Sequence, residues 1–338
     1  MHLPNLLLTA AAAGLIAAAA SAQESEPPAK AEPPATGLAD LQETVQALED
    51  EPPPAEAPPQ ATPQAEPAPP PAETPPPETP APAPPPAAPA AGPLVPLSRA
   101  QRAALEAAAV RGRLIGAIAA AGQVATRDML SRVSDPDGVG ISGWIAEPEG
   151  NGVTVTFYAE GTPGPAAVYR ANVLGGRVVG REIHLAGARP QLNPIQTRMA
   201  AARAATAGLD HSACGGESFN ALVVPPTTLD GPIDVYQISP QSAPGRFPVG
   251  GHYKTTVAAD GSVAAARGFT NACLEVAAPA PAPGAQPAPL AVTHLLDPLP
   301  TEIHVFLSIW AARPLVVVAG DPQRLFAVTP NGIAEVPR

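Results

Sequence analysis

Residues 138–187 read "GVGISGWIAEPEGNGVTVTFYAEGTPGPAAVYRANVLGGRVVGREIHLAG", and this segment decides the fold. It holds short apolar runs rich in Val, Ile and Tyr, with Gly or Pro in the turns between them, at residues 138–148, 152–161, 166–175 and 177–187. Such a pattern is typical of β-strands that follow one another in the chain. The pair Gly175-Gly176 suits a tight hairpin. The segment therefore predicts an antiparallel meander.

Two helices are predicted on either side of this meander. Ser98 and Gln101 form a capping-box pattern before the first helix, for which Gly122 is the expected stop. A shorter helix is expected near residues 126–133. The second main helix has both a start and a stop signal, with Asn193 as N-cap, Pro194 and Gln196 in the first turn, and Gly208 after the last turn.

The rest of the chain continues the β pattern. Strands are expected near residues 219–224, 233–239, 253–258 and 262–269. A Pro/Ala-rich loop at 277–289 precedes the last 49 residues, which hold four or five further strand-like runs. So short an all-β remnant needs staples to fold alone, and we expect it to complete the same core. Residues 97–338 are therefore predicted to form a single α+β domain with antiparallel sheets and two main helices.

The N-terminus predicts export. An apolar run of about 15 residues ends in Ala20-Ser21-Ala22, which indicates a signal peptide over residues 1–22. The run is shorter than the about 20 residues of a membrane-spanning helix, although the absence of Lys and Arg before it leaves a retained anchor as the alternative. We expect a periplasmic or secreted protein with no stable transmembrane segment after processing.

The net charge of −11 lies entirely in the N-terminal tail. From Glu24 to Pro96 the chain has 12 acidic residues and one basic residue, whereas from Leu97 to Arg338 it has 18 of each. A nucleic-acid-binding domain needs a basic face. The neutral balance of the C-terminal part therefore argues against a nucleic-acid partner.

The tail at residues 23–96 is predicted to be disordered, because it is rich in Pro, Ala and Glu and has few apolar side chains to bury. Residues 37–50 interrupt it with apolar residues at helical spacing: Leu38, Leu41, Val45 and Leu48. This short amphipathic helix could dock on a partner or self-associate. The alternative is a helix that only fluctuates, because isolated helices of this length are marginal.

The stretch "THLLDPLPTEIHVF", residues 293–306, could carry chemistry. We expect two strands, at residues 290–296 and 302–309, joined by a Pro-rich turn. A five-residue loop would place His294, Glu302 and His304 on one face, whereas a four-residue loop would turn His304 to the other face. With His252 as a further nitrogen ligand, this set resembles the ligands of a catalytic zinc, which would make the protein a metal-dependent hydrolase. The alternative is a set of ordinary polar residues on a sheet face, and we expect no cofactor.

Two cysteines follow the predicted signal peptide. Cys214 and Cys273 are expected to form a disulfide in an oxidising compartment. The alternatives are a nucleophilic Cys214 with His211 as its base, or two free thiols. The Pro- and Gly-rich loop at 239–255 carries Arg246 and Tyr253 and is a candidate binding loop, or simply a connection between strands.

A short apolar segment, a Pro-rich spacer and a C-terminal α+β domain together resemble the layout of energy-transducing TonB-type proteins. The spacer here is acidic and the C-terminal part is much larger, so the resemblance implies nothing about function. The sequence favours an exported bacterial envelope protein without catalytic activity, whose domain binds an envelope protein or cell-wall component while the tail acts as a flexible tether. The metal-dependent hydrolase is the alternative.

Overall fold

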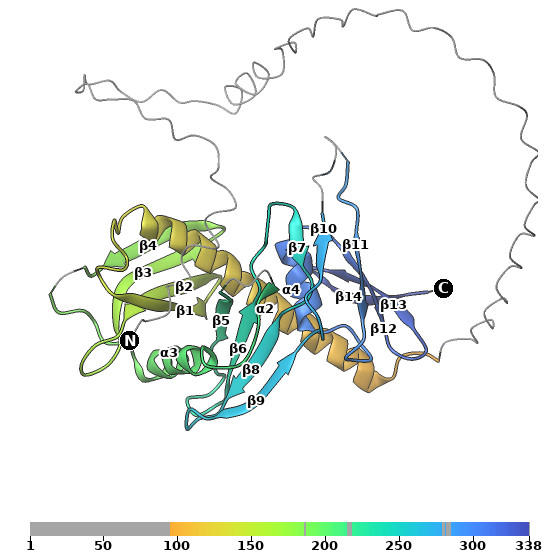
Figure 1. The fold of residues 1–338 in the computed structure, drawn as a ribbon, viewed down its shortest axis with the longest axis horizontal. Coiled ribbons are helices and arrows are strands. Elements are labelled where there is room, and N and C mark those ends of the chain that lie inside the picture. The colour runs from red at the N-terminus through yellow and green to blue at the C-terminus, as the bar shows by residue number, and fades with distance from the viewer. Residues whose placement is uncertain (1–94, 186, 215–217, 279–280, 282–284, 338) are drawn as a thin grey trace, which may run out of the picture. The chain divides into compact units, whose positions relative to one another are not determined.

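The computed structural model describes residues 95–337 apart from 186, 215–217, 279–280 and 282–284. The predicted signal peptide and amphipathic helix, and the predicted tail up to residue 94, therefore lie outside the described residues. The described chain has the α+β architecture expected from the sequence, with three helices and mainly antiparallel sheets (Figure 1).

The predicted meander is confirmed. Strands β1 (Ile141–Glu149), β2 (Gly152–Ala159), β3 (Ala166–Leu174) and β4 (Arg177–Ile183) form an antiparallel sheet in chain order. Its inner face is fully buried, with Val155, Phe157 and Tyr169 inaccessible to solvent. Phe157 and Tyr169 meet edge to face, with ring centroids 5.8 Å apart.

A second antiparallel sheet contains the next four predicted strands. Its order is β5 (Asn220–Val224), β6 (Ile233–Ile238), β8 (Tyr253–Val257) and β9 (Val263–Gly268). Helix α3 (Pro194–Thr206) begins as predicted, since the Asn193 side chain accepts from the backbone N–H of Gln196 and the Gln196 side chain accepts from that of Asn193. Its buried Met199 belongs to a cluster that includes residues of both sheets, among them Ile145 and Val235.

The C-terminal sheet has the order β11 (Leu290–His294), β12 (Leu315–Ala319), β13 (Arg324–Thr329) and β14 (Gly332–Val336). The prediction of a strand at 302–309 was wrong, because Glu302–Trp310 forms helix α4. Strands β11 and β12 consequently pair in parallel. Parallel neighbours need a crossover connection, commonly helical, and α4 lies within that connection.

Helix α2 (Arg99–Leu130) contacts strands of all three four-stranded sheets (Figure 1). The predicted stop at Gly122 was wrong, and so was the separate helix after it, since one helix of 32 residues covers both. Gly122 serves packing instead: a Cβ built there would lie 2.6 Å from Cη2 of Trp144. A glycine required by a distant side chain looks in sequence like a helix stop.

One hydrophobic core joins these parts. It contains Ile115 and Ile118 of α2, Phe157 of the first sheet, Val305 of α4 and Phe326 of the C-terminal sheet, all fully buried or nearly so. The C-terminal strands therefore share a core with the rest of the described chain. A close helix crossing helps: at Gly116 an added Cβ would lie 2.8 Å from Cδ1 of Ile309 in α4.

Candidate functional site

Of the residues predicted to bind zinc, only His294 and His304 have rings in contact with each other. His252 precedes β8, His294 ends β11, and His304 lies in the first turn of α4. The rings of His294 and His304 meet edge to face with centroids 4.6 Å apart. The two histidines lie side by side, and helix α4, not a hairpin, brings His304 to the end of β11.

His252 has both ring nitrogens occupied by hydrogen bonds. Its Nδ1 accepts from the backbone N–H of Ser239 at 3.2 Å, so Nε2 carries the proton and donates to the carbonyl oxygen of Pro248 at 2.9 Å. Burial lowers the pKa of His252 to about 4, although the hydrogen bond to Pro248 acts in the opposite direction. The side chain is therefore neutral at pH 7, with no free lone pair for a metal.

His304 is held in a similar way. Its Nδ1 accepts from the backbone N–H of Thr301 at 3.0 Å, which fixes the start of α4. Burial, followed by the proximity of His294, lowers the pKa of His304 to about 3. A neutral ring with Nδ1 occupied acts here as a capping group for the helix.

Asp297, which is partly exposed to solvent, forms a hydrogen bond with the buried His294. Nε2 of His294 lies 2.8 Å from Oδ2 of Asp297, and Arg267 donates to both Asp297 oxygens at 3.1 and 2.6 Å. Burial raises the pKa of Asp297, but hydrogen bonds from Arg267 and His294 outweigh it, and the pKa ends below its usual value. Arg267, Asp297 and His294 thus form a hydrogen-bonded network between β9 and the turn after β11.

Glu302 belongs to a separate network. Its Oε1 accepts from the Tyr236 hydroxyl at 3.0 Å and lies 3.6 Å from Nζ of Lys254. Lys254 Nζ also lies 3.4 Å from Asp234, with which Arg111 of α2 pairs. The carboxylate is thus directed to a tyrosine and a lysine of the second sheet.

Across the described residues, no group of three or more His, Cys, Asp or Glu side chains has an arrangement that could hold a metal ion. The hydrogen bonds of His252, His304 and Glu302 supply the physical reason. Both ring nitrogens of His252 and Nδ1 of His304 are bonded to backbone groups, and Glu302 is bonded to other side chains. This arrangement gives a zinc site no support.

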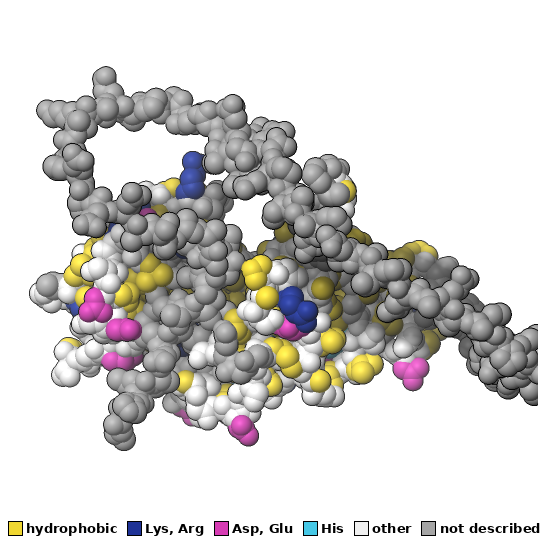
Figure 2. Space-filling model, turned by 45° about the horizontal axis from the view of Figure 1, so that its top comes forward, with side chains coloured by type: hydrophobic (Ala, Val, Ile, Leu, Met, Phe, Trp, Pro, Cys, Tyr) yellow, Lys and Arg dark blue, Asp and Glu magenta, His cyan; other side chains and the backbone are white. Residues whose placement is uncertain are grey.

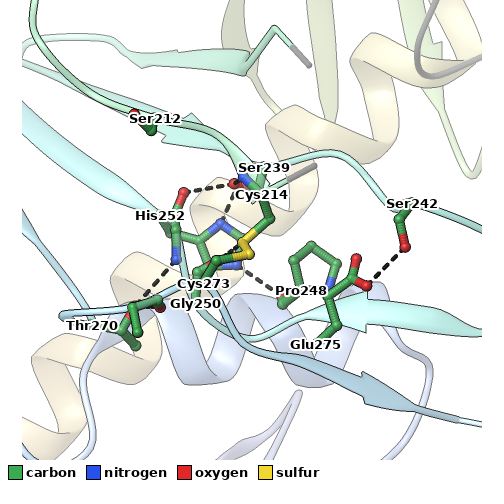
Figure 3. The surroundings of a disulfide bond; sticks show 12 residues. Ser212, Cys214, Ser239, Ser242, Pro248, Gly250, His252, Thr270, Cys273 and Glu275 are labelled. Carbon is green, nitrogen blue, oxygen red and sulfur yellow. Dashed lines mark hydrogen bonds between the residues drawn. A yellow bond between two sulfur atoms is a disulfide. The ribbon is translucent and has the colours of Figure 1, made fainter. Parts of the chain in front are cut away.

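Cys214 and Cys273 are joined at disulfide distance, as predicted, with their Cα atoms 5.4 Å apart (Figure 3). Ser239 braces the bridge, because its hydroxyl accepts from the backbone N–H of Cys214 at 2.9 Å and donates to the carbonyl oxygen of Gly251 at 2.7 Å. The sulfur of Cys214 is therefore bonded and cannot act as a thiolate nucleophile. The bridge and His252 both depend on Ser239, whose hydroxyl supports Cys214 and whose backbone N–H donates to His252.

The predicted binding loop contains a short strand, β7 (Arg246–Pro248), which pairs with β10 (Glu275–Ala277). The exposed Arg246 lies 3.3 Å from Glu275. Tyr253 stacks on His211, with ring centroids 4.1 Å apart, and meets Phe219 edge to face. These contacts fit a connection between strands, and a binding role for Arg246 and Tyr253 stays a prediction. The docking residues Leu38, Leu41, Val45 and Leu48 lie outside the described residues.

A cavity of about 80 Å³ was not predicted from the sequence. It lies where α2, α3 and α4 meet β1, β2, β5 and β6, and its lining is mainly apolar and aromatic: Ile141, Trp144, Phe157, Leu222, Phe306 and Trp310. The polar side chains of the lining are those of Gln123, Thr126, Arg203 and Asn220. Both tryptophans of the chain line it. No local pattern could have indicated it, because residues 119 and 310 are brought together only by the tertiary fold.

Charged side chains on the face drawn in Figure 2 are scattered, and Lys and Arg do not gather there into one basic patch. Among the helices of the described residues, none combines the length and apolar character needed to cross a membrane. Comparison with protein-family models, with curated proteins and with solved structures finds no match to this chain.

Proposed function

We propose that residues 95–337 form a binding domain without catalytic activity, which receives an apolar group in the cavity between α2, β1 and α4. The observation that carries this proposal is the cavity, with Trp144, Phe306 and Trp310 in its lining. Small-molecule sites are concave and mostly apolar, with a few polar groups that fix orientation. The cavity has this composition.

Binding is favoured over catalysis by the state of the reactive side chains. The buried histidines use their nitrogens in structural hydrogen bonds, and Cys214 is bonded to Cys273. General acid–base catalysis needs a titrating group with access to the reacting atoms. His252 and His304 are almost completely buried and are lined up with backbone partners instead.

The proposal includes export and tethering. A disulfide fits an oxidising compartment, which agrees with a periplasmic or secreted location, and the acidic Pro-rich tail would give the domain reach. The partner would be an envelope protein or cell-wall component, docked through Leu38, Leu41, Val45 and Leu48. Deleting residues 36–51 should remove the chain's crosslinks to envelope partners in intact cells. Unchanged crosslinks in the deletion variant would eliminate the docking role.

The cavity can be tested with its own fluorophores. Because both tryptophans line it, a neutral apolar acceptor dye such as N-phenyl-1-naphthylamine should quench their fluorescence in a saturable way. Ala119→Phe fills the cavity from α2 and should weaken the binding of the dye by about tenfold or more. Ala120→Phe, on an exposed position of the same helix, should leave the affinity for the dye unchanged. Equal dye binding by the two variants would refute a ligand role for this cavity.

A further inference from the structure

Among the described residues, the lining of the cavity has one charged side chain, Arg203 of α3. One nitrogen of its guanidinium donates to the carbonyl oxygen of Ala221 at 2.7 Å. Within the described part of the chain, no carboxylate forms an ion pair with Arg203, and the phenol of Tyr158 acts on its charge. The guanidinium therefore has donors left for a further acceptor, since it carries five N–H groups.

Arg203 is half-buried, so part of its charge is removed from water. Desolvation lowers the pKa of Arg203, although Tyr158 acts in the opposite direction, and a guanidinium stays protonated in proteins even so. A charge removed from water is costly unless it is paired. An anion in the cavity would supply the missing pairing.

Because Gly143 has no side chain, it leaves room for the Arg203 guanidinium. A Cβ built on Gly143 would lie 2.8 Å from Nε of Arg203 and 2.9 Å from the Tyr158 hydroxyl oxygen. Arg203 and Tyr158 thus come together over a position without a side chain, at the wall of the cavity. Any larger residue at position 143 would displace the guanidinium.

We propose that the cavity binds a small monocarboxylate with an apolar body. This inference rests on the proposed binding function and names its ligand class. The carboxylate pairs with Arg203 and the apolar body lies against Trp144, Phe306 and Trp310. Arg forms paired, charge-assisted hydrogen bonds with a planar carboxylate. A phosphate would bring more negative charge than one arginine balances, and the other polar groups of the lining, Gln123, Thr126 and Asn220, are neutral.

The size of the cavity limits the ligand. An apolar cavity of about 150 Å³ accepts benzene, and this one is about half as large. It therefore suits a short chain, the remainder of which extends past the exposed Gln123. Hexanoate and its neutral counterpart hexan-1-ol are suitable probes, because they differ mainly in the head group.

Tryptophan fluorescence at neutral pH gives the affinity of each probe for the full exported chain. The wild-type protein should bind hexanoate about tenfold more tightly than hexan-1-ol, as expected for one charge-assisted pair. Arg203→Gln should remove this preference for hexanoate without weakening the binding of hexan-1-ol. Arg203→Lys should keep part of it. Arg198→Gln is the matched control, because Arg198 lies on the same helix and also donates to backbone carbonyl groups, but outside the cavity.

The outcomes separate the two proposals. Equal affinity of the wild-type protein for both probes would overturn the carboxylate assignment and leave the apolar binding site intact. A preference for hexanoate that survives Arg203→Gln would overturn the role of Arg203. If neither probe nor the neutral dye changes the fluorescence, the binding function itself fails. Should Arg203→Gln not fold, as judged by circular dichroism, the wild-type ratio and Arg203→Lys decide the matter.

Discussion

The buried histidines should make the domain sensitive to mild acid, and His304 offers the clearest test. In the unfolded chain a histidine has a pKa of about 6.5, whereas in the folded domain burial and the neighbouring His294 lower the pKa of His304 to about 3. Below about pH 6.5 the unfolded chain therefore binds a proton that the folded domain does not. The contribution of the neutral His304 to the free energy of unfolding is therefore complete above about pH 6.5 and is lost as the pH falls towards 3.

The magnitude follows from the pKa difference. At pH about 5 the unfolded histidine is protonated and the folded one is not, which lowers the free energy of unfolding by about 2 kcal/mol relative to pH about 7.5. His252, with a pKa of about 4, contributes a similar amount. The two together remove about 4 kcal/mol, a large part of the about 5–15 kcal/mol that stabilises a typical domain.

Urea unfolding at both pH values measures this effect. His304→Asn keeps a side-chain acceptor for the Thr301 N–H but cannot titrate, so it should lose about 2 kcal/mol less than the wild-type protein on acidification. It should be less stable than the wild type at neutral pH, because the smaller side chain leaves space in the core. His184→Asn, just after β4 and outside the cluster, is the control, and the acid-induced loss assigned to His304 should persist in it because His304 is unchanged. Parallel losses in His304→Asn and wild type would refute the reasoning.

Two further predictions concern stability. Replacing both Cys214 and Cys273 by Ala should lower the free energy of unfolding by about 4 kcal/mol, because the bridge closes a loop across 59 positions. A urea titration with and without reductant measures this difference. An unchanged free energy of unfolding would show that the bridge adds nothing to stability. Gly116→Leu should cost about 1–3 kcal/mol or more, because the new side chain would meet Ile309 of α4, whereas Ala117→Leu, on the exposed side of the same helix, should be nearly neutral. Similar melting temperatures for these two leucine variants would contradict the close helix crossing.

The parts of the fold that could be predicted are those with local causes. Asn193 and Gln196 lie three residues apart, and their reciprocal hydrogen bonds form wherever a helix begins there. The meander is likewise encoded by short runs and their turns. Gly122 was misjudged because the reason for a glycine at that position is Trp144, 22 positions further on. The cavity could not be predicted at all, because its lining comes from seven different elements.

Helix α4 shows how a wrong element can still give a correct neighbourhood. Its sequence "EIHVFLSIW" contains β-branched and aromatic residues, and Ile303 to Ser308 are all buried, so no polar face reveals a helical period. A short, wholly apolar run does not distinguish a strand from a buried helix. The deciding signals lie at its start, where Thr301 precedes the helix, Glu302 occupies the first turn and His304 accepts from the Thr301 N–H.

His304 therefore explains both why a strand was wrongly predicted at 302–309 and why the rings of His294 and His304 meet. His304 at the third position of α4 can cap the helix only with its ring turned back towards the chain that leads out of β11, and His294 ends that strand. Because β11 and β12 are parallel, the connection must cross over the sheet, and this crossover carries the start of α4 next to the end of β11. The two rings meet because the helix start needs an acceptor there. A shared metal would require a free lone pair on each ring. Because Nδ1 of His304 accepts from the Thr301 N–H, the proton of the neutral ring lies on Nε2, and the His304 ring has no lone pair left for a metal.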